Sequence, residues 1–175
     1  NHPAGVPFQK TLQKGEIYQY MSDRDLSGSH IISIAGTNGV CKPIAVFSGS
    51  SWVGFCKDKA PGSGGDNLYQ QLYPITAWGK EFITAPFIRK PYDIFRVYFS
   101  KDNTTLTLNG IADPTIYNKG TFYEFTSTEA NSIKASEPIS VVQYQVSQNC
   151  DPANDGFSNT TAPHAADPEM TIFDP

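Results

Sequence analysis

Residues 23–28 have the sequence DRDLSG, which resembles the opening of a calcium-binding loop. Such loops place oxygen ligands at alternate positions and a glycine at the bend, and Asp23 and Asp25 occupy ligand positions here. The twelfth position of the loop should hold a bidentate glutamate, but this chain has Ile34 there. We therefore expect a plain turn between two strands, with a calcium site as the weaker alternative.

A second acidic turn near the C-terminal end contains Asp151, Asn154, Asp155 and Gly156. Its oxygen atoms could chelate calcium, but the same residue types also make an ordinary solvated loop. We favour the solvated loop, so Asp151 and Asp155 are weak candidate ligands. No other cofactor is expected.

The histidines do not support a catalytic or metal centre. They are His2, His30 and His164, and two of them lie near the chain ends. A triad needs a histidine held between an acid and a nucleophile, which this distribution does not favour. Zinc-type spacing is also missing, and the glycine-rich residues 62–65 lack the lysine of a phosphate-binding loop.

Glycoside hydrolysis would require two carboxylates on either side of the scissile bond. Asp66, Glu81 and Asp93 are available, yet charged residues are common at strand ends and no pattern selects two of these three. We predict that the chain is not an enzyme. A carbohydrate-active enzyme remains one alternative.

Aromatic residues give the best candidates for ligand binding. Trp52 and Phe55 lie within residues 49–66, where Gly, Ser, Pro and Lys follow one another too irregularly for a strand, so we expect a long loop. Tyr69 lies a few residues after the end of this loop. Large aromatic faces can stack on sugar rings or anchor a protein partner. Trp52, Phe55 and Tyr69 are therefore the candidate ligand-binding residues, with packing in the core as the alternative for each.

Composition excludes several classes of partner. The 175 residues are 39% hydrophobic, enough for the core of a single domain, and only 17% charged, with a net charge of -4. Such a neutral polar surface does not attract nucleic acid or anionic membrane surfaces. No apolar run approaches the ~20 residues that span a bilayer. The first residue is Asn1 and no signal peptide follows, so we expect a processed or excised chain.

The three cysteines form one pair and a leftover. We prefer a Cys56–Cys150 disulfide, because closing so long a loop would stabilise the fold by about 4 to 5 kcal/mol in the chain-entropy model. Three free thiols in a reducing compartment are the alternative, and the state of Cys41 stays open.

The elements that must position these residues are strands. Short alternating or apolar segments are interrupted by Gly, Pro and Asn about every ten residues, which is typical of an all-β fold and specifically of an antiparallel β-sandwich. Asn109-Gly110 is the clearest hairpin turn, because both residue types tolerate a positive φ. The expected strands span 6–12, 16–21, 30–34, 44–47, 82–85, 94–99, 104–108, 121–126, 139–146 and 170–173, with 68–73 ambiguous.

A weak internal repeat relates residues 14–47 to residues 119–142, since KGEIYQY in the first part matches KGTFYEF in the second. Two related β modules packed together would explain it. Shared composition between two strand-turn-strand units would explain it equally well.

Several blocks of sequence resemble the IgGFc-binding protein N-terminal domain family. They appear in order along most of the chain: 43–49 (PIAVFSG), 70–82 (QQLYPITAWGKEF), 100–105 (SKDNTT), 120–125 (GTFYEF), 141–144 (VVQY) and 147–151 (SQNCD). Many relatives have further cysteines after the first block, where this chain has only Cys56.

The resemblance implies an extracellular, non-catalytic, β-rich domain that acts in binding or adhesion, and a chain that is the core fragment of a larger protein. The expected partner is a glycan or glycoprotein, or neighbouring domains of the same assembly. A structural spacer or assembly subunit is therefore the main alternative function. Nothing in the sequence marks an antibody Fc site.

Overall fold

The computed structural model describes residues 2–37, 39–40, 42–56, 65–88, 90–147, 150 and 168–174. This part of the chain is almost entirely β structure and includes no α-helix, and nothing helical in it is long and apolar enough to cross a membrane. The elements are β1 (Phe47–Val53), β2 (Asp66–Gln71), the 3-10 helix η1 (Ile75–Ala77), β3 (Gly79–Thr84), β4 (Asp93–Phe99), β5 (Leu106–Leu108), β6 (Ile111–Ala112), β7 (Phe122–Ser127), β8 (Asn131–Gln145) and β9 (Glu169–Ile172).

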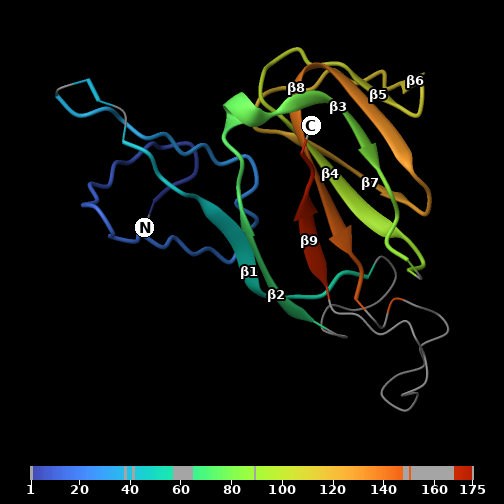
Figure 1. The fold of residues 1–175 in the computed structure, drawn as a ribbon, viewed down its shortest axis with the longest axis horizontal. Coiled ribbons are helices and arrows are strands. Elements are labelled where there is room, and N and C mark those ends of the chain that lie inside the picture. The colour runs from blue at the N-terminus through green and yellow to red at the C-terminus, as the bar shows by residue number, and fades with distance from the viewer. Residues whose placement is uncertain are drawn as a thin grey trace.

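Strand β8 organises the larger sheet, which has seven strands that all pair antiparallel (Figure 1). Its first half lies between β3 and β5, and its second half lies between β4 and β9. Pro138 separates the halves at a shift in the β3–β8 register. Proline cannot donate to a ladder, so it suits an irregularity of this kind. Strand β8 begins at Asn131 and continues across this proline to Gln145. The sequence predicts only the part of it that starts at residue 139.

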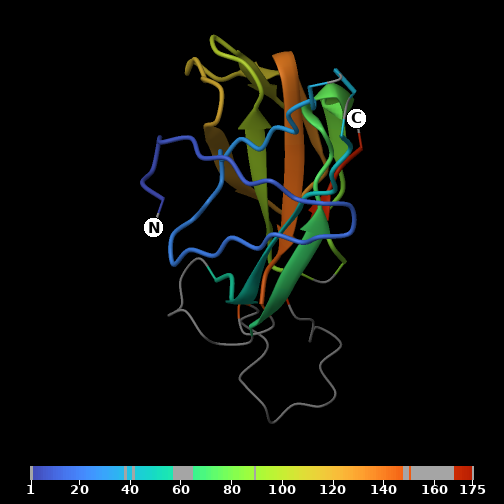
Figure 2. The same ribbon diagram turned by 90° about the vertical axis from the view of Figure 1, so that its left-hand side faces the viewer.

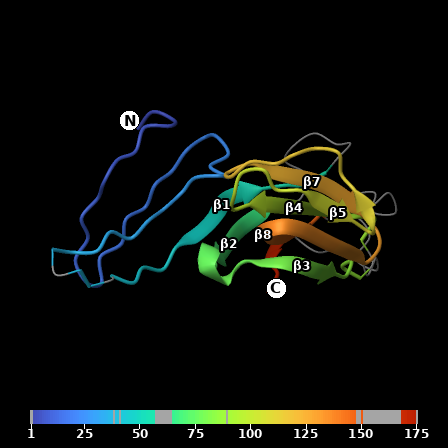
Figure 3. The same ribbon diagram turned by 90° about the horizontal axis from the view of Figure 1, so that it is seen from above.

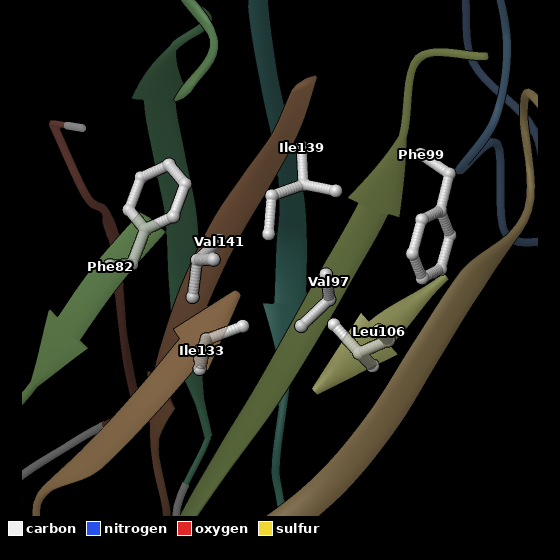
Figure 4. Close-up of a cluster of buried hydrophobic side chains, with 7 residues drawn as sticks. All are labelled: Phe82, Val97, Phe99, Leu106, Ile133, Ile139 and Val141. Carbon is white, nitrogen blue, oxygen red and sulfur yellow. The ribbon is translucent and has the colours of Figure 1, made fainter. Parts of the chain in front are cut away.

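Alternating side chains of these strands form the main core. Seven buried residues meet there (Figure 4): Phe82, Val97, Phe99, Leu106, Ile133, Ile139 and Val141. Strand β4 shows the expected period of two, with every second residue buried. The Asn109-Gly110 turn is confirmed, since both residues have a positive φ, of 52° and 81°.

The β1–β2 hairpin covers part of the larger sheet through a second, smaller core. Leu68 of β2 packs there with Val142, Tyr144 and Ile172 of β8 and β9. Two antiparallel layers with apolar side chains between them make up the β-sandwich that the sequence predicts.

The predicted strands at 6–12, 16–21 and 30–34 are wrong, since the described residues there form no strand. Turns are present between these segments, with Gly15 and Gly28 at positive φ. Figure 2 shows this N-terminal segment, whose described residues are 2–37, 39–40 and 42–46, running back and forth, and these residues form no strand. Rings of Phe8, Tyr18 and Tyr20 contact one another between the runs, but each stays at least 40% exposed and Ile17 is 92% exposed, so the described residues of the segment form no buried core.

The predicted loop at 49–66 is also wrong in part. Residues 49–53 belong to β1, which begins at Phe47 rather than at residue 44, and Asp66 begins β2. A register shift between Ser50 and Val53 accommodates the irregular sequence within the hairpin. The centre of the predicted loop, residues 57–64, lies outside the described residues.

Candidate functional site

The outward face of the β1–β2 hairpin is the main candidate site. Gly49 pairs with Tyr69 and Ser50 pairs with Leu68, so Tyr69 and Leu68 point to opposite faces. Leu68 is buried against the larger sheet, whereas Tyr69 is 69% exposed. Tyr69 therefore faces away from the core.

Phe47 joins Tyr69 on this face. Their rings are stacked with centroids 5.0 Å apart and planes only 4° from parallel. Gly49, opposite Tyr69, has no room for a side chain, because an added Cβ would lie 1.9 Å from the carbonyl oxygen of Leu68. Glycine at this position lets the two strands approach and leaves the Phe47–Tyr69 pair as the projecting group. The sequence placed Phe47 in a strand and gave it no role.

Trp52 is the third aromatic residue exposed on this hairpin. It precedes Val53, which turns inward to the smaller core, and its own side chain is 66% exposed. The edge of its indole ring lies against Gly65, just before β2. We call Phe47, Trp52 and Tyr69 the aromatic face. Its neighbours along both strands are mostly Ser, Asn and Gln, a neutral setting suited to sugar rings or to a protein partner.

Phe55 does not belong to this face. Its ring lies 5.2 Å from that of Tyr144 and packs against the smaller core. Its backbone N–H donates to the Ser147 hydroxyl at 2.9 Å, and its carbonyl accepts from the Ser147 N–H at 3.1 Å. Phe55 thus joins the end of the hairpin to the residues after β8, so its described contacts are structural.

The predicted Cys56–Cys150 disulfide is confirmed, and it closes the same junction one residue further along. The hairpin that presents the aromatic face is therefore fastened to the larger sheet by side-chain packing, hydrogen bonds and a covalent bond. Cys41 lies outside the described residues.

The predicted calcium ligands are not brought together among the described residues, which contain no group of three or more potential metal ligands. Asp25 accepts a hydrogen bond from Arg96 Nη1 at 2.9 Å, and Asp23 makes no described side-chain contact. Asp151 and Asp155 lie outside the described residues. Calcium binding by these four residues stays a prediction.

The three carboxylates considered for glycoside hydrolysis occupy different environments. Glu81 on β3 pairs with Lys134 at 3.2 Å, Asp66 lies on the hairpin, and Asp93 is buried at the start of β4. A polar hollow of about 300 Å³ at the end of β7 contains one further carboxylate, Glu129. That hollow therefore offers one carboxylate where hydrolysis of this kind needs two. A second hollow, of about 360 Å³, is lined by Glu81 and Asp174, but Glu81 is paired there with Lys134.

Asp93 is a buried carboxylate with a structural role. Its Oδ2 accepts hydrogen bonds from the backbone N–H of Phe87 at 2.7 Å and from Gln143 Nε2 at 2.8 Å. Its Oδ1 is buried without a hydrogen-bond partner in the described part of the chain. Burial raises the pKa of this carboxyl above the ordinary 3.8, although the two donors act in the opposite direction.

This raised pKa predicts a pH dependence of stability. As the pH rises above 3.8, the unfolded chain loses its Asp93 proton before the folded chain does, so this group makes the fold less stable toward neutral pH. We expect Asp93→Asn to remove this contribution, which urea unfolding between about pH 4 and about pH 7 would measure. Asp93→Ala also removes the titrating carboxyl, but it should be less stable than Asp93→Asn by about 1 to 3 kcal/mol at every pH, because two donors lose their acceptor. An unchanged pH profile in Asp93→Asn would contradict the assignment.

Comparison with known proteins agrees with the resemblance noted in the sequence. The model of the family described as IgGFc binding protein matches residues 1–175. The human (Homo sapiens) protein named IgGFc-binding protein is 32% identical over 109 residues. That alignment covers 62% of this chain and only 2% of the human protein. No solved structure matches the chain.

Proposed function

Because this chain belongs to the IgGFc-binding protein family, we propose that it is an extracellular, non-catalytic domain that binds a glycan or glycoprotein through its aromatic face. The observation that carries this proposal is the exposure of Phe47, Trp52 and Tyr69 together on one hairpin. Exposed aromatic clusters of this kind are uncommon without a partner, because they forgo burial of a large apolar area.

Two further features support an extracellular adhesive role. The Cys56–Cys150 disulfide is of the kind that persists in oxidising compartments. The human relative's name refers to the Fc part of IgG, a glycoprotein. IgG Fc is therefore a reasonable first partner to test, alongside a set of free glycans.

Binding to immobilised IgG Fc, with and without its N-glycans, and to a glycan array tests the proposal. We expect Trp52→Ala and Tyr69→Ala each to weaken binding about 30-fold or more, as a central interface aromatic does. Ile83→Ala is the matched control, because Ile83 is 73% exposed but lies on β3 of the larger sheet. Equal binding by all four proteins would refute the role of the aromatic face.

The assembly alternative is favoured by a separate observation. Many large apolar side chains of the N-terminal segment are exposed, including Ile17, Met21 and Ile32. Surfaces of this kind are typical of contacts between domains or subunits. A solution mass that rises with concentration would support assembly, and a constant monomer mass would count against self-assembly.

A further inference from the structure

In the described part of the chain, one turn of the N-terminal segment makes side-chain hydrogen bonds to the larger sheet. The Asp25 carboxylate accepts a hydrogen bond from Arg96 Nη1 at 2.9 Å, and the Ser27 hydroxyl lies 3.2 Å from the Tyr98 hydroxyl. Arg96 Nη1 also lies 3.4 Å from the Ser27 hydroxyl. Among the described residues, these are the side-chain hydrogen bonds and ion pairs between this segment and the rest of the chain. We call Asp25, Ser27, Arg96 and Tyr98 the clasp.

The turn that carries Asp25 and Ser27 is held by hydrogen bonds of its own. Asp25 Oδ1 accepts a hydrogen bond from the Ser27 N–H at 2.9 Å, and the Ser29 N–H donates to the Leu26 carbonyl at 3.1 Å. Gly28 lies so close to Gly120 that an added Cβ would be 2.1 Å from the Gly120 oxygen. The turn therefore fits flat against the bend that precedes β7.

The sheet side of the clasp is held independently of the segment. Arg96 Nε donates to Glu124 at 2.7 Å, and the guanidinium lies 4.4 Å from the centre of the Phe122 ring. Both partners belong to β7, beside Arg96 on β4. Arg96 can therefore keep its position whether or not Asp25 is present, which makes it a preformed receptor for that carboxylate.

Beyond the clasp, the next backbone hydrogen bond between described residues of the segment and of the rest of the fold lies at its C-terminal end. The Val46 carbonyl accepts a hydrogen bond from the Leu72 N–H at 2.9 Å, and β1 follows directly. Seen from above, most of the segment extends away from the sheets and one bend reaches back toward β7 (Figure 3). The two attachment points are thus one turn and one continuous connection to the hairpin.

We propose that the clasp is a releasable attachment: opening it lets the N-terminal segment move about the start of β1 and uncovers the Arg96 and Tyr98 side chains. A single, partly exposed ion pair holds surfaces together only weakly, so the closed state can exchange with an open one. This inference does not depend on the proposed ligand. It concerns a conformational change next to the hairpin that carries the aromatic face.

Hydroxyl-radical footprinting of the whole chain, read by mass spectrometry, tests the proposal. We expect Asp25→Ala to raise the oxidation rate of Tyr98, whose hydroxyl lies beside Ser27, about two- to ten-fold, which is the population shift that loss of one such ion pair and hydrogen bond produces. Asp23→Ala is the matched control, because it removes the same charge two residues earlier, where no described side-chain contact is lost. Phe99, which is 2% exposed, reports on global unfolding and should not change.

A second variant and a second measurement separate release from local damage. Gly28→Ala keeps Asp25 and Ser27, but it strains the turn, where Gly28 has a φ of +85°, and blocks the approach to Gly120, so it should give the same footprint as Asp25→Ala. The radius of gyration from small-angle scattering should rise in both variants and not in Asp23→Ala. Identical footprints for Asp25→Ala and Asp23→Ala, or a parallel rise at Phe99, would overturn the proposal.

Discussion

Replacing both Cys56 and Cys150 by serine is expected to lower the free energy of unfolding by about 4 to 5 kcal/mol. The bond joins positions separated by 94 residues, so it removes much of the conformational freedom of the unfolded chain. Single domains have a total stability of only about 5 to 15 kcal/mol, so a loss of this size brings the fold close to its limit.

Urea unfolding of the wild type and the double variant, each with and without reductant, measures this effect. Reductant should destabilise the wild type to the level of the variant and leave the variant unchanged. The hairpin should be affected first, because the disulfide fastens its end to the residues after β8. A double variant within about 1 kcal/mol of the oxidised wild type would show that packing around Phe55 suffices to hold the hairpin.

Phe99→Ala is expected to cost about 3 to 5 kcal/mol, as truncation of a buried phenylalanine usually does. Phe99 is 2% exposed and its ring stacks on Tyr117 with centroids 4.3 Å apart. It belongs to the main core, where its strand β4 and the other strands that pair with β8 contribute buried side chains. The cavity left by the truncation would therefore affect the centre of the larger sheet.

Phe47→Ala is the matched control for this prediction, since it makes the same change on the exposed aromatic face. We expect it to alter stability by about 0.5 kcal/mol or less, as is usual for surface positions. Thermal or urea unfolding of the two variants measures the contrast. Equal destabilisation by both would mean that the Phe47–Tyr69 stack is part of the core rather than an exposed binding surface.

Strand positions from residue 79 onward could largely be predicted because their signal is local. Alternating apolar residues between turn-forming residues predicted β3, β4, β5, β7 and the second half of β8, and Asn109-Gly110 predicted the hairpin turn. The same signal was wrong for residues 6–34. Alternation shows that a segment can form a strand, but a ladder also needs a neighbouring strand and a packed face, which this segment lacks among the described residues.

The candidate site was predictable only in outline. Trp52, Phe55 and Tyr69 were chosen by residue type, and the structure exposes Trp52 and Tyr69 while turning Phe55 toward Tyr144. Phe47 was missed because a phenylalanine within a strand usually points inward. Its exposure follows from its register with β2, which single-sequence reasoning did not include.

By itself, the sequence determined the class of fold and the main turn, because side-chain alternation and the backbone preference at Asn-Gly are properties of neighbouring residues. It favoured the Cys56–Cys150 pair without excluding free thiols, and the structure decided that pairing. Only the tertiary structure decided which face of each strand is buried and that Asp25 meets Arg96. These outcomes depend on residues about 70 positions apart being brought together, as the 71-residue separation of Asp25 and Arg96 shows. The physical reason is that a strand presents two equivalent faces until another layer covers one of them.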